Sequence, residues 1–178
     1  MFIGLMFLLA LSTAENVQVP PEPGLYYLTP QGPVRLEGHA VAVSRPHKKV
    51  PVPGVGGGQA RAEILGIHAE REVSSSPVFY YRVPAGSEST GAGDLVLVKL
   101  RKHEKLREFT VSGEADWSAS SGIPLRSQVQ FNTRQVENGV FRLEPADDLV
   151  AGEYGFYLFR GRELPGLLYD FSVEDAGQ

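Results

Sequence analysis

Glycine and proline interrupt this chain so often that no long regular element fits between them. Three clusters rich in Gly, Pro and Ser, at 45–59, 84–93 and 113–124, predict long loops, because glycine favours positive φ and proline fixes φ and lacks an N–H. The stretches between them are short and rich in aromatic and β-branched residues, which is typical of strands. No stretch shows the sustained 3.6-residue period of a capped helix. The pattern therefore predicts short strands joined by loops.

Eleven runs are predicted to be strands, at 25–29, 34–36, 40–43, 62–68, 78–83, 95–101, 106–111, 128–135, 140–143, 154–159 and 168–173. Asn138 and Gly139 separate two of these runs and predict a tight hairpin with a type I′ turn, in which both central residues have positive φ. A single helical turn is expected at 145–148, since proline suits the first helical position. The expected fold is all-β, antiparallel and sandwich-like, with few or no helices.

The segment Leu149-Val150-Ala151-Gly152-Glu153-Tyr154 resembles the tyrosine corner of immunoglobulin-like sandwiches. In that motif a tyrosine at the start of a strand bonds back to the backbone just upstream. The resemblance implies structural roles for Gly152 and Tyr154, and an immunoglobulin-like sandwich for the C-terminal part of the chain. A jelly-roll-like sandwich is the alternative. This chain has alanine where the family usually has proline, and it has no flanking cysteine pair.

The first residues of the chain predict export. Residues 1–11 are almost wholly apolar, Ser12-Thr13-Ala14 follows, and the first charge is Glu15. We expect a signal peptide over 1–14, cleaved after Ala14, although no Lys or Arg precedes the apolar run. The alternative is a buried first strand or helix. The run is too short to span a bilayer, which takes about 20 apolar residues.

The mature chain, 15–178, is expected to be a single β-rich domain in the periplasm or outside the cell. Any subdomain boundary would fall near 113–126, and no transmembrane span is expected in the mature chain. The sequence contains no cysteine, which excludes disulfides and thiolate chemistry. Its net charge of −4 gives no support to nucleic-acid binding, because such proteins are usually basic.

No common catalytic motif is present. The sequence lacks Gly-x-Ser-x-Gly, His-Glu-x-x-His, Ser-x-x-Lys and the phosphate-binding Gly-x-x-x-x-Gly-Lys. The glycine-rich run 54–58 is not followed by Lys-Ser or Lys-Thr, so we interpret it as a loop. No residue is therefore assigned a catalytic role, and no cofactor is expected.

Two sets of residues have side chains that can serve as metal ligands. The histidines His39, His47, His68 and His103 have no short spacing typical of zinc ligands, so a zinc site would have to be assembled from distant elements. The carboxylates of Glu144, Asp147, Asp148 and Glu153 have the oxygen chemistry of a calcium site. A solvated turn capped by one carboxylate is the preferred interpretation of the second set, and no metal is expected.

Cations are concentrated in one predicted hairpin. They are Lys99, Arg101, Lys102, Lys105 and Arg107. Side chains two apart in a strand share a face, so several of these cations are expected to project together and attract an acidic glycan, lipid head groups or a partner protein. The alternative is an exposed hairpin kept soluble by its charge, with Glu104 and Glu108 pairing across it.

Aromatic residues are the other candidate contacts. Tyr26-Tyr27 and Tyr80-Tyr81 are adjacent pairs in predicted strands, and adjacent strand residues point to opposite faces. Tyr27 and Tyr81 are therefore candidate binding residues, with burial in the core as the favoured alternative. Trp117 lies among Ser and Gly in the third loop cluster, where an exposed ring would suit sugar stacking or protein contact.

Four short motifs resemble a group of exported bacterial proteins with no assigned function. The motifs lie at 24–27 (Gly-Leu-Tyr-Tyr), 97–109, 152–156 (Gly-Glu-Tyr-Gly-Phe) and 169–173 (Tyr-Asp-Phe-Ser-Val). The resemblance implies a β-rich exported protein of bacterial type and assigns no catalytic residue.

We therefore expect an exported, non-catalytic binding or structural-interaction module of the periplasm or cell envelope. Its partner would be an envelope protein or a glycan. The alternatives are a polysaccharide-active enzyme that uses dispersed carboxylates such as Glu114 and Asp116 near Trp117, and an accessory subunit of an envelope complex.

Overall fold

The computed structural model describes residues 17–44, 60–86, 91–111, 123–160 and 166–174. Within these ranges the chain forms fourteen strands and two single-turn 3₁₀ helices. The strands are β1 (Gly24–Thr29), β2 (Gly32–Arg35), β3 (Gly38–Ala40), β4 (Ala42–Ser44), β5 (Ala60–Leu65), β6 (Glu72–Val73), β7 (Phe79–Arg82), β8 (Leu95–His103), β9 (Leu106–Val111), β10 (Gln128–Val129), β11 (Phe131–Glu137), β12 (Val140–Pro145), β13 (Gly152–Leu158) and β14 (Leu167–Val173). The 3₁₀ helices are η1 (Ala92–Asp94) and η2 (Leu125–Ser127). The predicted all-β class is thus confirmed.

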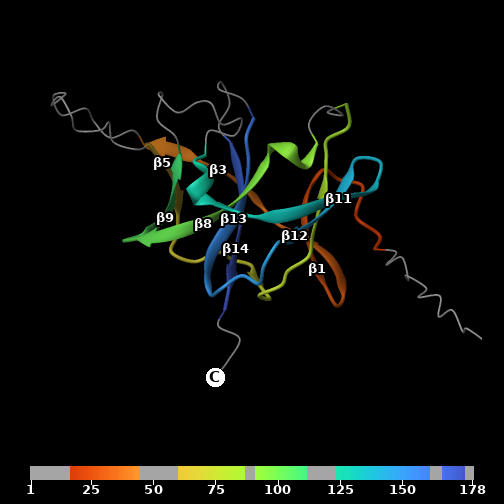
Figure 1. The fold of residues 1–178 in the computed structure, drawn as a ribbon, viewed down its shortest axis with the longest axis horizontal. Helices are drawn as coiled ribbons and strands as arrows, with labels where there is room; N and C mark the ends of the chain where they lie inside the picture. Colours follow the sequence, from red (N-terminus) through yellow and green to blue (C-terminus); the bar gives the residue numbers. More distant parts are fainter. Residues whose placement is uncertain (1–16, 45–59, 87–90, 112–122, 161–165, 175–178) are drawn as a thin grey trace, which may run out of the picture.

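The strands form two sheets. The smaller has the order β11-β12-β7-β1-β2, and the larger has the order β3-β14-β13-β8-β9-β5-β4, with β10 added beside β8 and β6 beside β14. The pairings are antiparallel except for β6 with β14. In Figure 1 β11, β12 and β1 lie on the right, while β5, β9 and β8 curl away on the left.

The larger sheet curls so far that its two end strands are consecutive in the chain. β3 and β4 flank the single residue Val41, and β3 pairs with β14 while β4 pairs with β5. The Val41 N–H donates to the carbonyl of Gly166, with N···O 3.2 Å. One continuous segment, 38–44, therefore bridges the two ends of the sheet and makes its concave side an enclosed interior.

Two separate cores lie on the two faces of the larger sheet. Between the sheets, Phe79 of β7 contacts Phe156 of β13 and Phe171 of β14, with ring centroids 5.2 and 4.9 Å apart. On the concave side a second cluster is formed by Val41, Ala62, Val96, Val98, Leu100, Phe109, Ile123, Tyr157 and Leu168. Because both faces are covered, β8 begins with the continuous apolar run Leu-Val-Leu-Val and β13 is buried from Glu153 to Leu158.

The small sheet is also covered on both faces. Tyr26, Tyr80 and Val140 form a third cluster with Val19, which lies upstream of β1, and the Tyr26 hydroxyl donates to the carbonyl of Glu22, with O···O 2.7 Å. Tyr81 points to the opposite face and is 2% exposed in the core between the sheets. Tyr81 therefore cannot stack on a ligand in this conformation, whereas Tyr27 is half-buried.

The eleven predicted strands all occur, with differences of detail. The predicted run 62–68 is a strand only as far as Leu65, because residues 66–68 form a bend. The predicted run 40–43 is split into β3 and β4, and 128–135 into β10 and β11, while the two-residue β6 was missed because it has no alternation to detect. The helical turn predicted at 145–148 is wrong: Pro145 ends β12, and the Ala146 N–H donates to the carbonyl of Gln130 instead.

The hairpin at Asn138 and Gly139 is confirmed, but the type I′ turn is wrong. Gly139 has φ 71°, and the one described non-glycine residue with positive φ is Glu104, so Asn138 does not have it. The pairing register shifts between Gln135 and Glu137. One extra residue on β11 therefore forms a β-bulge beside the turn. The bulge increases the local twist of the strands, a twist that a type I′ turn would match without a bulge.

The tyrosine-corner hydrogen bond is present. The Tyr154 hydroxyl donates to the carbonyl of Val150, with O···O 2.8 Å, and its ring stacks on Phe171 with 5.9 Å between centroids. Gly152 has φ 155°, and a Cβ there would lie 3.2 Å from the Lys99 Cε atom. The bond fixes the chain where it enters β13, as the sequence motif predicted.

Replacing Tyr154 by Phe removes this hydrogen bond and leaves the ring in place. We expect Tyr154→Phe to lower the free energy of unfolding by about 1 kcal/mol, measured by urea denaturation. Tyr27→Phe is the control, because the Tyr27 hydroxyl accepts only a long 3.4 Å contact from the Ser74 N–H. An unchanged midpoint in the Tyr154 variant would show that the bond contributes nothing.

Burial of Tyr81 should make the fold sensitive to alkali. Desolvation raises the pKa of Tyr81 from its ordinary value of 10 to about 12, and the neighbouring Tyr169 adds to the rise. Because the folded-state pKa is raised, the stability that depends on the protonated hydroxyl is complete below pH 10 and is lost as the pH rises towards 12. Tyr81→Phe should therefore lose less stability over this interval than the wild type, as followed by circular dichroism. Equal losses of stability in the variant and the wild type would show that ionisation of Tyr81 does not destabilise the fold.

Candidate functional site at one end of the curled sheet

One end of the concave interior is closed by charged side chains. Six residues, which we call the ion-pair cluster, lie there: His39, His68, Lys102, Arg107, Glu153 and Asp170. Strand alternation explains the placement, since Arg107 shares the inward face of β9 with Phe109 and Asp170 shares that of β14 with Leu168. Polar residues thus occupy the inward positions where the apolar interior ends.

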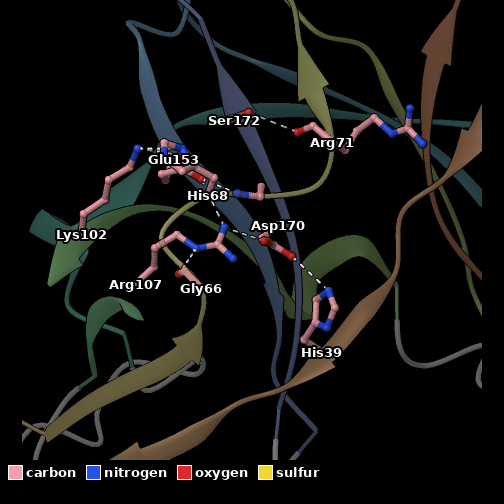
Figure 2. Close-up of polar contacts among 10 residues, drawn as sticks. His39, Gly66, His68, Arg71, Lys102, Arg107, Glu153, Asp170 and Ser172 are labelled. Carbon is pink, nitrogen blue, oxygen red and sulfur yellow. Dashed lines mark hydrogen bonds and ion pairs between the residues drawn. The ribbon is translucent and has the colours of Figure 1, made fainter. Parts of the chain in front are cut away.

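Arg107 is the centre of the cluster. Its Nη1 lies 2.6 Å from Asp170 Oδ2 and 3.2 Å from Glu153 Oε2, and its Nε donates to the carbonyl of Gly66 over 2.9 Å. The three charged side chains are each 3–5% exposed. Figure 2 shows the guanidinium between the two carboxylates. Ion pairs this deeply buried are only weakly screened by solvent.

The outer ends of the cluster reach solvent. His39 Nε2 lies 3.3 Å from Asp170 Oδ1. On the other side, Lys102 Nζ and His68 Nδ1 lie 3.1 and 3.2 Å from Glu153 Oε1, and the backbone N–H of Ala69 donates to Glu153 Oε2 over 2.9 Å. All four carboxylate oxygens therefore have a partner.

One contact decides the role of His68. Lys102 Nζ lies 3.0 Å from His68 Nδ1, and an ammonium can only donate. The same ring nitrogen cannot accept from Lys102 and donate to Glu153 at once. We assign Nδ1 as the acceptor, because a protonated ring would place two cations in contact. Lys102 then bridges the histidine and the carboxylate.

The cation-rich hairpin is only partly the exposed patch predicted from the sequence. Arg107 is buried in the ion-pair cluster, and Lys102 pairs with Glu153. Lys99 is exposed, with its Nζ 5.4 Å from the centroid of the Tyr154 ring. Arg101 and Lys105 are exposed, and within the described ranges no ion pair involves either one. The alternative pairing of Glu108 across the hairpin is replaced by an ion pair with Arg61 at 2.8 Å.

The other sequence candidates are not brought together. Trp117, Glu114, Asp116 and His47 lie outside the described residues. Of the calcium candidates, Glu153 belongs to the ion-pair cluster, Glu144 pairs with Arg142, and Asp148 accepts from the Ser76 hydroxyl. In the described ranges no three His, Asp or Glu side chains are grouped to hold a metal ion.

The ion-pair cluster is absent from the predicted sites, although the sequence contains a signal for it. Glu153 and Asp170 each stand among aromatic residues in strands, in Gly-Glu-Tyr-Gly-Phe and Leu-Tyr-Asp-Phe. A carboxylate in a strand buried on both faces is rarely tolerated without a partner. The sequence does not distinguish Arg107, which is buried, from the exposed cations Arg101 and Lys105 of the same hairpin.

A shallow depression of about 390 Å³ lies on the small sheet, lined by Asn132, Thr133, Arg134, Arg142 and Glu144.

No helix in the described ranges has the length and apolar character needed to cross a bilayer. Comparison with known proteins found no matching family model, no similar curated protein and no similar solved structure.

Replacing Arg107 should show how much the ion-pair cluster contributes to the stability of the fold. Arg107→Gln leaves two buried carboxylates without their cation, so we expect a loss of about 3–5 kcal/mol of unfolding free energy, measured by urea denaturation. Arg101→Gln is the matched control on the neighbouring strand, where an exposed cation should matter by less than about 0.5 kcal/mol. Equal effects of the two changes would contradict the network described above.

Proposed function

We propose that this chain is an exported, non-catalytic binding module of the bacterial cell envelope. The observation that supports this most is that both buried carboxylates, Glu153 and Asp170, have every oxygen occupied by a partner from the chain itself. A general acid or base needs an atom within hydrogen-bond reach of a substrate. The cluster is better suited to holding the fold than to catalysis.

The surface beside the cluster supports attachment. We call it the cationic tip and define it as Leu65, Ile67, Arg101, His103 and Lys105, all of which are exposed. The tip lies at the β8–β9 turn, and in Figure 1 the arrowhead of β8 points away from the body of the molecule. Cations on a protein with a net charge of −4 orient it towards negatively charged partners.

Export is supported by the apolar run followed by Ser12-Thr13-Ala14. The alternative function, hydrolysis of an envelope polysaccharide, depended on Glu114 and Asp116, and those residues lie outside the described ranges. The binding function therefore has support from both the sequence and the described surface.

The test is binding to a native bacterial envelope fraction. The protein is purified from the exporting host, and its mass is measured so that the presence of residues 1–14 is known. We expect the wild type to cosediment, and a variant with Arg101→Glu and Lys105→Glu to bind about tenfold more weakly, since each cation near an anionic surface contributes about 1 kcal/mol.

The matched control reverses two other exposed cations, Arg126 and Arg134, and should bind like the wild type. Binding of the wild type should also fall as salt is added, because salt screens exposed charges. The proposal is wrong if the wild type does not bind, or if both double variants bind as well as it does.

A further inference from the structure

The cationic tip exposes two large aliphatic side chains. Leu65 is 86% exposed and Ile67 43% exposed. Leu65 is the cross-strand partner of Leu106, which pairs in turn with His103. These three side chains form one row across β5, β9 and β8, on the outer face of the sheet.

The ion-pair cluster holds this segment in place from beneath. The carbonyl of Gly66, between the two exposed aliphatic residues, accepts from Arg107 Nε at 2.9 Å. The Gly66 N–H donates to the carbonyl of Lys105 at 3.0 Å. Downstream, Glu153 accepts from the Ala69 N–H and contacts His68. Leu65 and Ile67 are therefore presented by a fixed backbone, which lowers the entropy cost of binding.

We propose that the cationic tip docks on an anionic phospholipid surface, with Leu65 and Ile67 entering the acyl boundary and Arg101, His103 and Lys105 meeting the phosphates. This rests on the proposed binding function and names its ligand. Aliphatic side chains beside cations are the combination that interfacial membrane binding uses. The acidic neighbours of the tip are Glu104, at the turn itself, and Glu108, the cross-strand partner of Arg101, which forms an ion pair with Arg61.

The tip suits other partners less well. A stable protein interface buries about 800 Å² on each side, far more than two aliphatic residues and a hairpin turn present. Sugar binding usually employs an exposed aromatic ring, and the segments 65–67 and 101–106 contain no Phe, Tyr or Trp. A lipid surface requires neither, because a few inserted side chains and several cations are sufficient. The net charge of −4 further favours approach by the tip alone, since the rest of the chain is repelled.

The test is flotation with vesicles of phosphatidylcholine alone and of an equimolar mixture of phosphatidylcholine and phosphatidylglycerol. We expect the wild type to bind the mixed vesicles and not the neutral ones. A tip variant with Leu65→Ser and Lys105→Glu should bind the mixed vesicles at least about tenfold more weakly. Every variant has the same N-terminus, so any retained apolar leader contributes equally to all of them.

The control variant has Leu125→Ser and Arg126→Glu, which remove an exposed leucine and an adjacent exposed cation from η2. It should bind the mixed vesicles like the wild type. All four substituted side chains are exposed, so both variants should fold, which urea denaturation verifies. Equal binding by the two variants, or equal binding of the wild type to both kinds of vesicle, would overturn the proposal.

The envelope experiment separates the two conclusions. If envelope binding depends on the tip but the vesicles are not bound, the lipid assignment fails, the binding function stands, and the ligand is an envelope protein or glycan. If neither the vesicles nor the envelope fraction is bound, both conclusions fail.

Discussion

The guanidinium of Arg107 is the interaction on which this end of the molecule depends. It contacts carboxylates from β13 and β14 and a carbonyl from the segment after β5, while its own strand is β9. Four parts of the curled sheet that are distant in sequence therefore meet at one side chain. A hydrophobic residue at this position would fill the space, but it would form none of these directional contacts. Buried ion pairs often contribute little net stability compared with apolar packing, so their value here is the geometry that they impose on residues 65–69.

The second organising feature is the larger sheet, which has a core on each side. Apolar residues on both faces of β8, β13 and β14 support the aromatic contacts of Phe79 with Phe156 and Phe171 on one side, and the interior around Phe109 and Leu168 on the other. Such a sheet leaves few positions where charge is tolerated, which is why the carboxylates of Glu153 and Asp170 are found where the interior ends.

Much of the fold was predictable because strand alternation and turn chemistry are local. Runs such as 106–111 and the hairpin at Gly139 could be read from neighbouring residues alone. The candidate site was not predictable in the same way. Arg107 and Lys102 were identified as cations of one hairpin, but whether each is exposed or buried depends on β13 and β14, which follow it in the chain by 40 residues or more. The pairing of β3 with β14 is equally non-local, and no turn motif in the sequence predicts it. The hydrogen bond of Tyr154 was found from sequence because it spans only four residues.

The bridging segment around Val41 has a consequence for how the chain matures. Residues 38–40 pair with 167–169, so the curled sheet cannot close until nearly the whole chain has been synthesised. Contacts this distant in sequence form late and slowly, since a long loop must close before they are gained. A nascent chain of this kind remains without its final structure while its C-terminal strands are still missing.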